Sequence, residues 1–268
     1  MTIQALKQNK IKSAEGFVNP VLKEIIGTGT CTKPNGELCE IAGHITPGVG
    51  QFLQKLIREM QPVKTLEVGL GFGVSAMYIC DALPKTPQTC HIVIDPYQDT
   101  DQKGSWEGVG LHNLKKAGYA EIIKFYQFPS YQVLPKLLEE GHKIDFAFID
   151  GWHTFDFTLV DFFYVDKMLR IGGVIAFDDA DWPAIHKLCR YIATNLSYQV
   201  VGTENRANSR LTFKRRILRV ICKAFPSLRH LFNPEIMQSD AELGLFGRCV
   251  VFRKLSDDAR RWDSHNDF

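Results

Sequence analysis

Aspartates follow three apolar runs of this chain, and together they could hold a cation. They are Asp95, Asp150 and the pair Asp178 and Asp179. If the runs are parallel strands, these acids lie at the carboxyl edge of the sheet, where open α/β sheets bind ligands. The strands before Asp150 and Asp178 are predicted neighbours, so their carboxylates should converge. Grouped carboxylates repel one another unless a cation lies between them, and oxygen ligands favour Mg²⁺ or a similar hard divalent ion. The alternative is that each aspartate caps a helix separately.

A histidine stands three residues after one of these acids, in the order Asp150, Gly151, Trp152, His153. Imidazole has an unperturbed pKa of ~6.5, so it can accept a hydroxyl proton near neutral pH. Beside a metal ligand, His153 is therefore a candidate general base. The alternative is a structural role at the end of the strand. Trp152 is expected either to line an acceptor site or to belong to the core.

A glycine-rich turn follows another apolar run, with Gly69, Gly71 and Gly73 at alternate positions and Glu67 before them. Glycine lets a backbone approach a ligand closely, and a helix N-terminus behind the turn offers unpaired N–H groups. The dinucleotide fingerprint requires G-x-G-x-x-G, whereas the spacing here is G-x-G-x-G. Glu67 would repel a pyrophosphate but suits a ligand with an amino group.

Asp95 stands 22 positions after Gly73, which is the distance that one crossover helix requires. An acid at the end of the strand after a nucleotide-binding turn can accept hydrogen bonds from both ribose hydroxyls. The alternative is again a helix cap.

Short apolar runs alternate with helical patterns along most of the chain. The predicted strands are residues 65–68, 90–94, 122–128, 144–149, 174–177, 198–203 and 248–255. Such alternation predicts a parallel sheet that helices cover on both faces. We therefore expect an α/β fold with a Rossmann-like, doubly wound, mostly parallel seven-stranded sheet. Thr46 and Pro47 are typical of a helix start, and the apolar spacing predicts that this helix reaches Met60.

The chain has 268 residues and 45% hydrophobic residues, which suits one large domain with additions. We expect a helical and loop segment at 1–45, the main domain at 46–255 and a polar, mobile tail at 256–268. In the first segment, residues 17–26 show helical spacing and 27–39 resemble a loop.

Composition excludes several classes of function. The formal net charge of +2 predicts no general attraction to nucleic acid. No apolar run approaches the ~20 residues that span a bilayer. Seven scattered cysteines indicate reduced thiols and a cytoplasmic protein rather than a disulfide framework.

A basic insertion is expected at about 205–245, before the last strand. No acidic residue occurs between Glu204 and Glu235, and apolar residues at helical spacing predict an amphipathic helix over 210–232. The helix could pack on the domain, contact an anionic membrane surface, mediate a homodimer or cover an acceptor site. Residues 17–26 offer a second apolar face that could pair in a homodimer.

Taken together, the motif Glu67-x-Gly69-x-Gly71-x-Gly73 resembles motif I of the class I S-adenosylmethionine-dependent methyltransferases. Residues 46–195 are similar to the catechol and caffeoyl-CoA O-methyltransferases and to the macrolide-sugar O-methyltransferases. The resemblance implies that Glu67, the three glycines and Ser75 hold the methionine end of the donor. It assigns Asp95 to the ribose, Ser130 and Tyr131 to the turn that contacts adenine, and Asp150, Asp178 and Asp179 to the metal.

This sequence departs from the catechol enzymes at two positions. They carry Asn where this chain has Asp179, so the site here would be more anionic. They use a lysine base where this chain has His153. The Asp-x-x-His arrangement is similar to that of the sugar methyltransferases.

The resulting hypothesis is methyl transfer from S-adenosylmethionine to a hydroxyl of a small vicinal diol, catechol or sugar. Mg²⁺ or a similar ion would assist, with Asp150 and His153 as the catalytic residues. The alternatives are a metal-independent methyltransferase, a nicotinamide-dependent oxidoreductase, and a non-catalytic protein that binds the donor or docks on a membrane. Nucleic acid is not an expected substrate, because no Asn/Asp-Pro-Pro-aromatic tetrad follows the fourth strand.

Overall fold

The fold is taken from a computed structural model, which describes residues 19–98, 104–203, 217–218, 220–221, 224–225 and 237–268. Its main feature is a seven-stranded sheet in the order β5-β4-β3-β6-β7-β9-β8. The strands are β3 (Lys64–Val68), β4 (Cys90–Ile94), β5 (Ile123–Tyr126), β6 (Ile144–Ile149), β7 (Leu169–Phe177), β8 (Tyr198–Thr203) and β9 (Val250–Lys254). The first five pair in parallel, and β9 is antiparallel to both of its neighbours. The predicted mostly parallel, doubly wound sheet is therefore confirmed.

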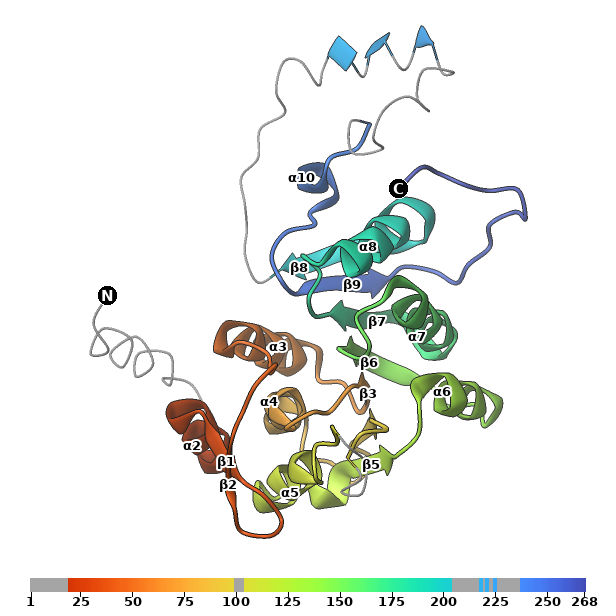
Figure 1. The fold of residues 1–268 in the computed structure, drawn as a ribbon. Helices are drawn as coiled ribbons and strands as arrows, with labels where there is room; N and C mark the ends of the chain where they lie inside the picture. The colour runs from red at the N-terminus through yellow and green to blue at the C-terminus, as the bar shows by residue number, and fades with distance from the viewer. Residues whose placement is uncertain (1–18, 99–103, 204–216, 219, 222–223, 226–236) are drawn as a thin grey trace, which may run out of the picture.

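Helices cover both faces of this sheet (Figure 1). On one side lie α3 (Pro47–Met60), α4 (Val74–Ala82) and α5 (Val109–Lys116), and on the other lie α6 (Ser130–Glu139), α7 (Phe155–Met168) and α8 (Pro183–Asn195). A short 3-10 helix, η1 (Ala120–Ile122), precedes β5. Each face has its own buried apolar cluster, because alternate side chains of each strand point to opposite faces.

The start of α3 follows the prediction from sequence. Thr46 caps the helix, and its Oγ1 accepts a hydrogen bond from the backbone N–H of Val49 at 3.2 Å. By contrast, β7 begins five residues earlier than the predicted start at Val174. Its register with β6 shifts between Ile144 and Phe146, which accommodates the extra residues.

The described part of the N-terminal segment packs onto the main domain. Its helix α2 (Pro20–Thr28) buries Val21, Leu22, Ile25 and Ile26 in the same cluster as α3 and α4. That part of the 17–26 face is therefore not free for the proposed homodimer. The expected loop at 27–39 is instead a hairpin in which β1 (Thr30–Thr32) pairs with β2 (Leu38–Glu40).

Most of the basic insertion, including most of 210–232, lies outside the described residues. Its end returns to the domain through α10 (Asp240–Leu243), whose Asp240 pairs with the buried Arg190 of α8. The polar tail is attached to the domain, which differs from the expected mobile tail. Asn195 in α8 accepts a hydrogen bond from the Asn266 N–H at 2.7 Å, and its own amide donates to the Asn266 carbonyl at 3.0 Å.

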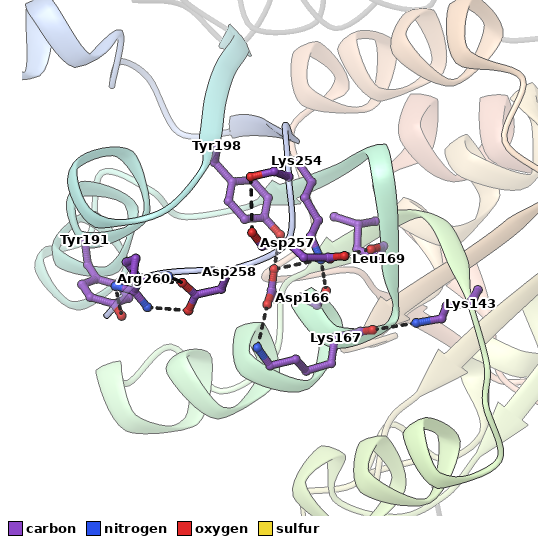
Figure 2. Close-up of polar contacts among 11 residues, drawn as sticks. Lys143, Asp166, Lys167, Leu169, Tyr191, Tyr198, Lys254, Asp257, Asp258 and Arg260 are labelled. Carbon is purple, nitrogen blue, oxygen red and sulfur yellow. Dashed lines mark hydrogen bonds and ion pairs between the residues drawn. The ribbon is translucent and has the colours of Figure 1, made fainter. Parts of the chain in front are cut away.

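The buried Lys254 fixes the start of this tail (Figure 2). Its Nζ donates to the carbonyls of Asp166 at 2.6 Å and Leu169 at 3.2 Å, and pairs with Asp257 at 2.8 Å. Asp166 also accepts a hydrogen bond from the Tyr198 hydroxyl at 2.8 Å. This network joins α7, β8 and the tail near the edge of the sheet opposite β5.

Among the helices that the structure describes, none has the length and apolar content to cross a membrane.

Candidate functional site

The glycine turn joins β3 to α4 and requires glycine at its first position. Gly69, Gly71 and Gly73 have φ values of 91°, 51° and 77°, which side chains rarely allow. A Cβ on Gly69 would lie 2.0 Å from the backbone oxygen of Asp150, and one on Gly73 would lie 2.9 Å from that of Gly110. The turn therefore packs directly against the residue that begins the predicted Asp-x-x-His group.

Asp95 fixes the backbone of this turn. Its Oδ2 accepts hydrogen bonds from the N–H groups of Leu70 at 3.0 Å and Gly71 at 2.9 Å. Its Oδ1 accepts one from Tyr97 N–H at 2.7 Å, and the side chain of Gln98 bridges Oδ2 and the Gly71 carbonyl. Asp95 is buried. The spacing that suggested a ribose contact did not reveal this role, while the ribose contact itself stays a prediction.

Glu67 is fully buried in β3, beside a histidine that sequence reasoning missed. Its Oε2 lies 3.2 Å from Nε2 of His91 on β4, and Nδ1 of that imidazole lies 2.9 Å from the Thr65 hydroxyl. Glu67 Oε1 has no hydrogen-bond partner among the described residues. The contact depends on the register that pairs Thr65 with His91, which sequence reasoning did not supply. Ser75 is also buried, in the first turn of α4.

The structure brings Asp150, His153 and Asp179 together. One possible ligand atom from each lies within 4.8 Å of the others, and His153 Nδ1 is 3.6 Å from Asp179 Oδ2. Asp150 directly follows β6, and Asp179 follows β7 by two residues, so the parallel pairing of these strands produces the convergence. Two of the three predicted metal ligands therefore meet, together with the predicted base.

Asp178 does not belong to this group, and its carboxylate pairs with Arg248. The Arg248 Nε and Nη2 atoms lie 3.2 Å and 3.1 Å from Asp178 Oδ2, and Nε lies 3.0 Å from Asp179 Oδ1. Asp178 is buried, and its Oδ1 has no hydrogen-bond partner among the residues that the structure describes. Sequence reasoning missed Arg248, because 70 residues separate it from Asp178.

The electrostatics of the group favour a cation. Burial raises the pKa of Asp150 well above its ordinary value, and the nearby charges of Asp178 and Asp179 raise it further, while Arg248 opposes the rise. Burial also raises the pKa of Asp178 to about 6, again against the effect of Arg248. Two carboxylates and an imidazole form a donor set that suits a divalent ion, so the residues present fit the metal implied by the sequence.

Aromatic side chains lie beside this group. Trp152 is 56% exposed, which excludes the core position considered from sequence. Its ring centroid is 6.1 Å from that of Tyr97 and 6.4 Å from that of Phe157, which in turn is 6.1 Å from Tyr131. These rings link the start of α6 to the Asp-x-x-His segment.

Ser130 begins α6, and its side chain opposes the rise that burial causes in the pKa of Asp161 on α7. Tyr131, the other residue assigned to adenine, is 47% exposed.

Known methyltransferases match this sequence. A family described as a methyltransferase domain matches residues 66–180. A protein of Arabidopsis thaliana named as a caffeoyl-CoA O-methyltransferase is 31% identical over 181 residues, which cover 67% of this chain and 72% of that protein. The caffeoyl-CoA O-methyltransferase of Populus kitakamiensis is 33% identical over 137 residues, which cover 50% of this chain and 53% of that relative. The chain thus spans about half the length of the second relative.

Solved structures show the same fold. An O-methyltransferase from Bacillus cereus, in complex with S-adenosylhomocysteine, aligns with a TM-score of 0.57 and 18% identity over 74% of this chain and 90% of that one. The O-methyltransferase TomG from Streptomyces achromogenes, in complex with S-adenosylmethionine, aligns with a TM-score of 0.55 and 20% identity over the same shares.

Proposed function

Given that the chain belongs to the class I S-adenosylmethionine-dependent O-methyltransferases, we propose that it methylates a vicinal diol, a catechol or a sugar with the help of a divalent cation. The observation that carries this proposal is the convergence of Asp150, His153 and Asp179 beside the glycine turn. A hydroxyl acceptor agrees with the family. The two adjacent acceptor oxygens and the cation are our inference from the donor set.

The donor is assigned to the glycine turn and its surroundings. We propose that Glu67 Oε1, which lacks a partner among the described residues, accepts from the methionine ammonium beside Ser75. Asp95 Oδ1 accepts one backbone N–H and retains lone-pair capacity for a ribose hydroxyl. Both carboxylates are buried, so these contacts require the covering residues to move when the donor enters. Ser130 and Tyr131 are assigned to adenine.

The chemistry divides between the donor, the cation and His153. The donor's sulfonium makes its methyl group electrophilic, so the protein mainly supplies alignment and an activated oxygen. A divalent cation held by Asp150 and Asp179 would lower the pKa of an acceptor hydroxyl and orient it. Asp179 faces His153 Nδ1 at 3.6 Å, so we assign proton transfer to Nε2.

A metal-independent methyltransferase is the second candidate. Arg248 already neutralises part of the carboxylate charge through Asp178 and Asp179. In that case His153 alone would activate the acceptor.

A membrane-docking role rests on residues 210–232, most of which lie outside the described residues. The cytoplasmic location rests on composition, and the homodimer rests on the apolar spacing of 210–232, because the described part of the 17–26 face is buried against the main domain.

The test is methyl transfer to matched acceptors. We expect product formation with a 3,4-dihydroxyphenyl or vicinal-diol acceptor. With the matching monohydroxy analogue, the rate should fall at least roughly tenfold. Exhaustive chelation should abolish transfer, and Mg²⁺ should restore it. Asp150→Ala should be inactive, whereas His265→Gln in the tail should match the native protein. Normal rates after chelation, or in Asp150→Ala, would remove the metal mechanism and leave the metal-independent candidate.

A further inference from the structure

The carboxylate group contains a positive charge of its own. Arg248 stands two residues before β9, and its guanidinium contacts both Asp178 and Asp179. Its carbonyl also accepts a hydrogen bond from the Ala180 N–H at 2.7 Å, so the segment before β9 is fixed to the loop after β7 from both backbone and side chain. The position of this guanidinium is thus set by the fold.

The charges can be counted from these contacts. Asp150, Asp178 and Asp179 together carry a charge of −3 when ionised, and Arg248 reduces the sum to −2. Arginine is a permanent cation in proteins, so its contribution does not vary with pH in the physiological range. One divalent ion balances the remainder.

We infer that Arg248 acts as a fixed counter-cation beside the group Asp150, His153 and Asp179. Its guanidinium pairs with Asp178, and the carboxylate charge that remains equals that of a single divalent ion. The inference rests on the metal site of the proposed function. Two guanidinium nitrogens lie on Asp178 Oδ2, whereas only one contacts Asp179, whose Oδ2 faces His153; this agrees with the position of Asp178 outside the group of possible ligands. The inference also explains how Asp178 is accommodated with little exposure and with one oxygen that has no partner in the described part of the chain.

The test is a cycle of two substitutions, Asp179→Asn and Arg248→Gln. Mg²⁺ is titrated by calorimetry into protein saturated with S-adenosylhomocysteine. Asp179→Asn alone should weaken Mg²⁺ binding by about tenfold or more, because Arg248 then opposes only two carboxylates. Adding Arg248→Gln should restore affinity to within roughly threefold of native, because the net charge returns to −2.

A matched control removes an arginine from β9 itself. Arg253 on β9 is exposed and pairs in register with Val174, four residues before Asp178. Adding Arg253→Gln to Asp179→Asn should leave the weakened affinity unchanged. The inference is overturned if Arg248→Gln gives no recovery, or if Arg253→Gln gives the same recovery.

A measurement of Tm without metal distinguishes loss of the Arg248–Asp178 pair from a general loss of structure. In the presence of a chelator, Arg248→Gln should lower the Tm, because Asp178 then stands buried without its partner. Asp178→Asn should cancel most of that loss in the double variant. Additive effects of the two substitutions on Tm would contradict the pairing. Absence of Mg²⁺ binding to the native protein would overturn both this inference and the metal mechanism, whereas methyl transfer itself would stand if the donor product still binds.

Discussion

Replacement of Asp95 by asparagine tests how the glycine turn is held. The carboxylate accepts three backbone N–H groups, from Leu70, Gly71 and Tyr97, at 2.7–3.0 Å. Asparagine keeps the shape but presents one acceptor oxygen, so its NH₂ group must face at least one of these donors. A buried N–H left without an acceptor costs roughly 1–3 kcal/mol. We expect a loss of unfolding free energy of that size, which lowers the Tm by roughly 2–10 °C.

The same change should weaken S-adenosylhomocysteine binding, because the displaced turn is the proposed donor site. A loss of roughly tenfold in affinity corresponds to about 1.4 kcal/mol of binding free energy, which lies within the range expected for the unpaired N–H. Asp145 provides a matched control at the opposite end of β3, where its Oδ2 accepts the N–H groups of Val63 at 3.0 Å and Lys64 at 2.8 Å. Asp145→Asn should therefore lower the Tm comparably but leave donor affinity unchanged. Equal donor affinities for native protein and Asp95→Asn, measured by calorimetric titration, would refute the reasoning.

Three further substitutions follow from the geometry. Gly69→Ala places a Cβ 2.0 Å from the Asp150 carbonyl at a positive φ, so it should cost at least about 2 kcal/mol in denaturant unfolding and abolish donor binding; unchanged binding would contradict the close approach. Burial raises the pKa of Asp161 to about 6, so the folded state holds the carboxyl proton of Asp161 more tightly than the unfolded state does. The free energy of unfolding of the native protein therefore falls as the pH rises from about 4 to 6. Asp161→Asn should therefore be more stable than native by roughly 1–3 kcal/mol at pH 8 and lose that advantage near pH 4, and an equal advantage at both pH values would exclude this cause. His153→Gln should lower kcat by roughly a hundredfold or more while donor affinity stays native, and a kcat within threefold of native would exclude the base role.

The sequence was sufficient for the features of the fold that depend on local pattern. The helix from Pro47 to Met60 follows from its cap and apolar spacing, and the central strands follow from short apolar runs between helical patterns. The β1–β2 hairpin was missed because each strand has only three residues and their burial pattern is mixed. The early start of β7 was missed because Gly172 and Gly173 resemble a turn, whereas the structure absorbs them in a register shift.

The candidate site was predictable where its residues directly follow strands. Asp150 and Asp179 converge because parallel strands end at the same edge, and Gly69 was identified by its spacing from Gly71 and Gly73 together with Glu67 before it. The partners Arg248 and His91 were not predictable, because their contacts depend on strand order and register rather than on neighbouring residues. For that reason the sequence assigned Asp178 to the metal without indicating that an arginine occupies it.

The most direct test of the account is Mg²⁺ binding to the S-adenosylhomocysteine complex, compared between the native chain and Asp150→Asn. Asp150 belongs to the ligand group and directly adjoins the glycine turn, so this residue connects the proposed cation to the donor site. The account predicts one calorimetric binding event in the native protein and its loss in the variant, with the donor product still bound in both. Absence of Mg²⁺ binding to the native protein, or equal binding by the variant, would contradict it.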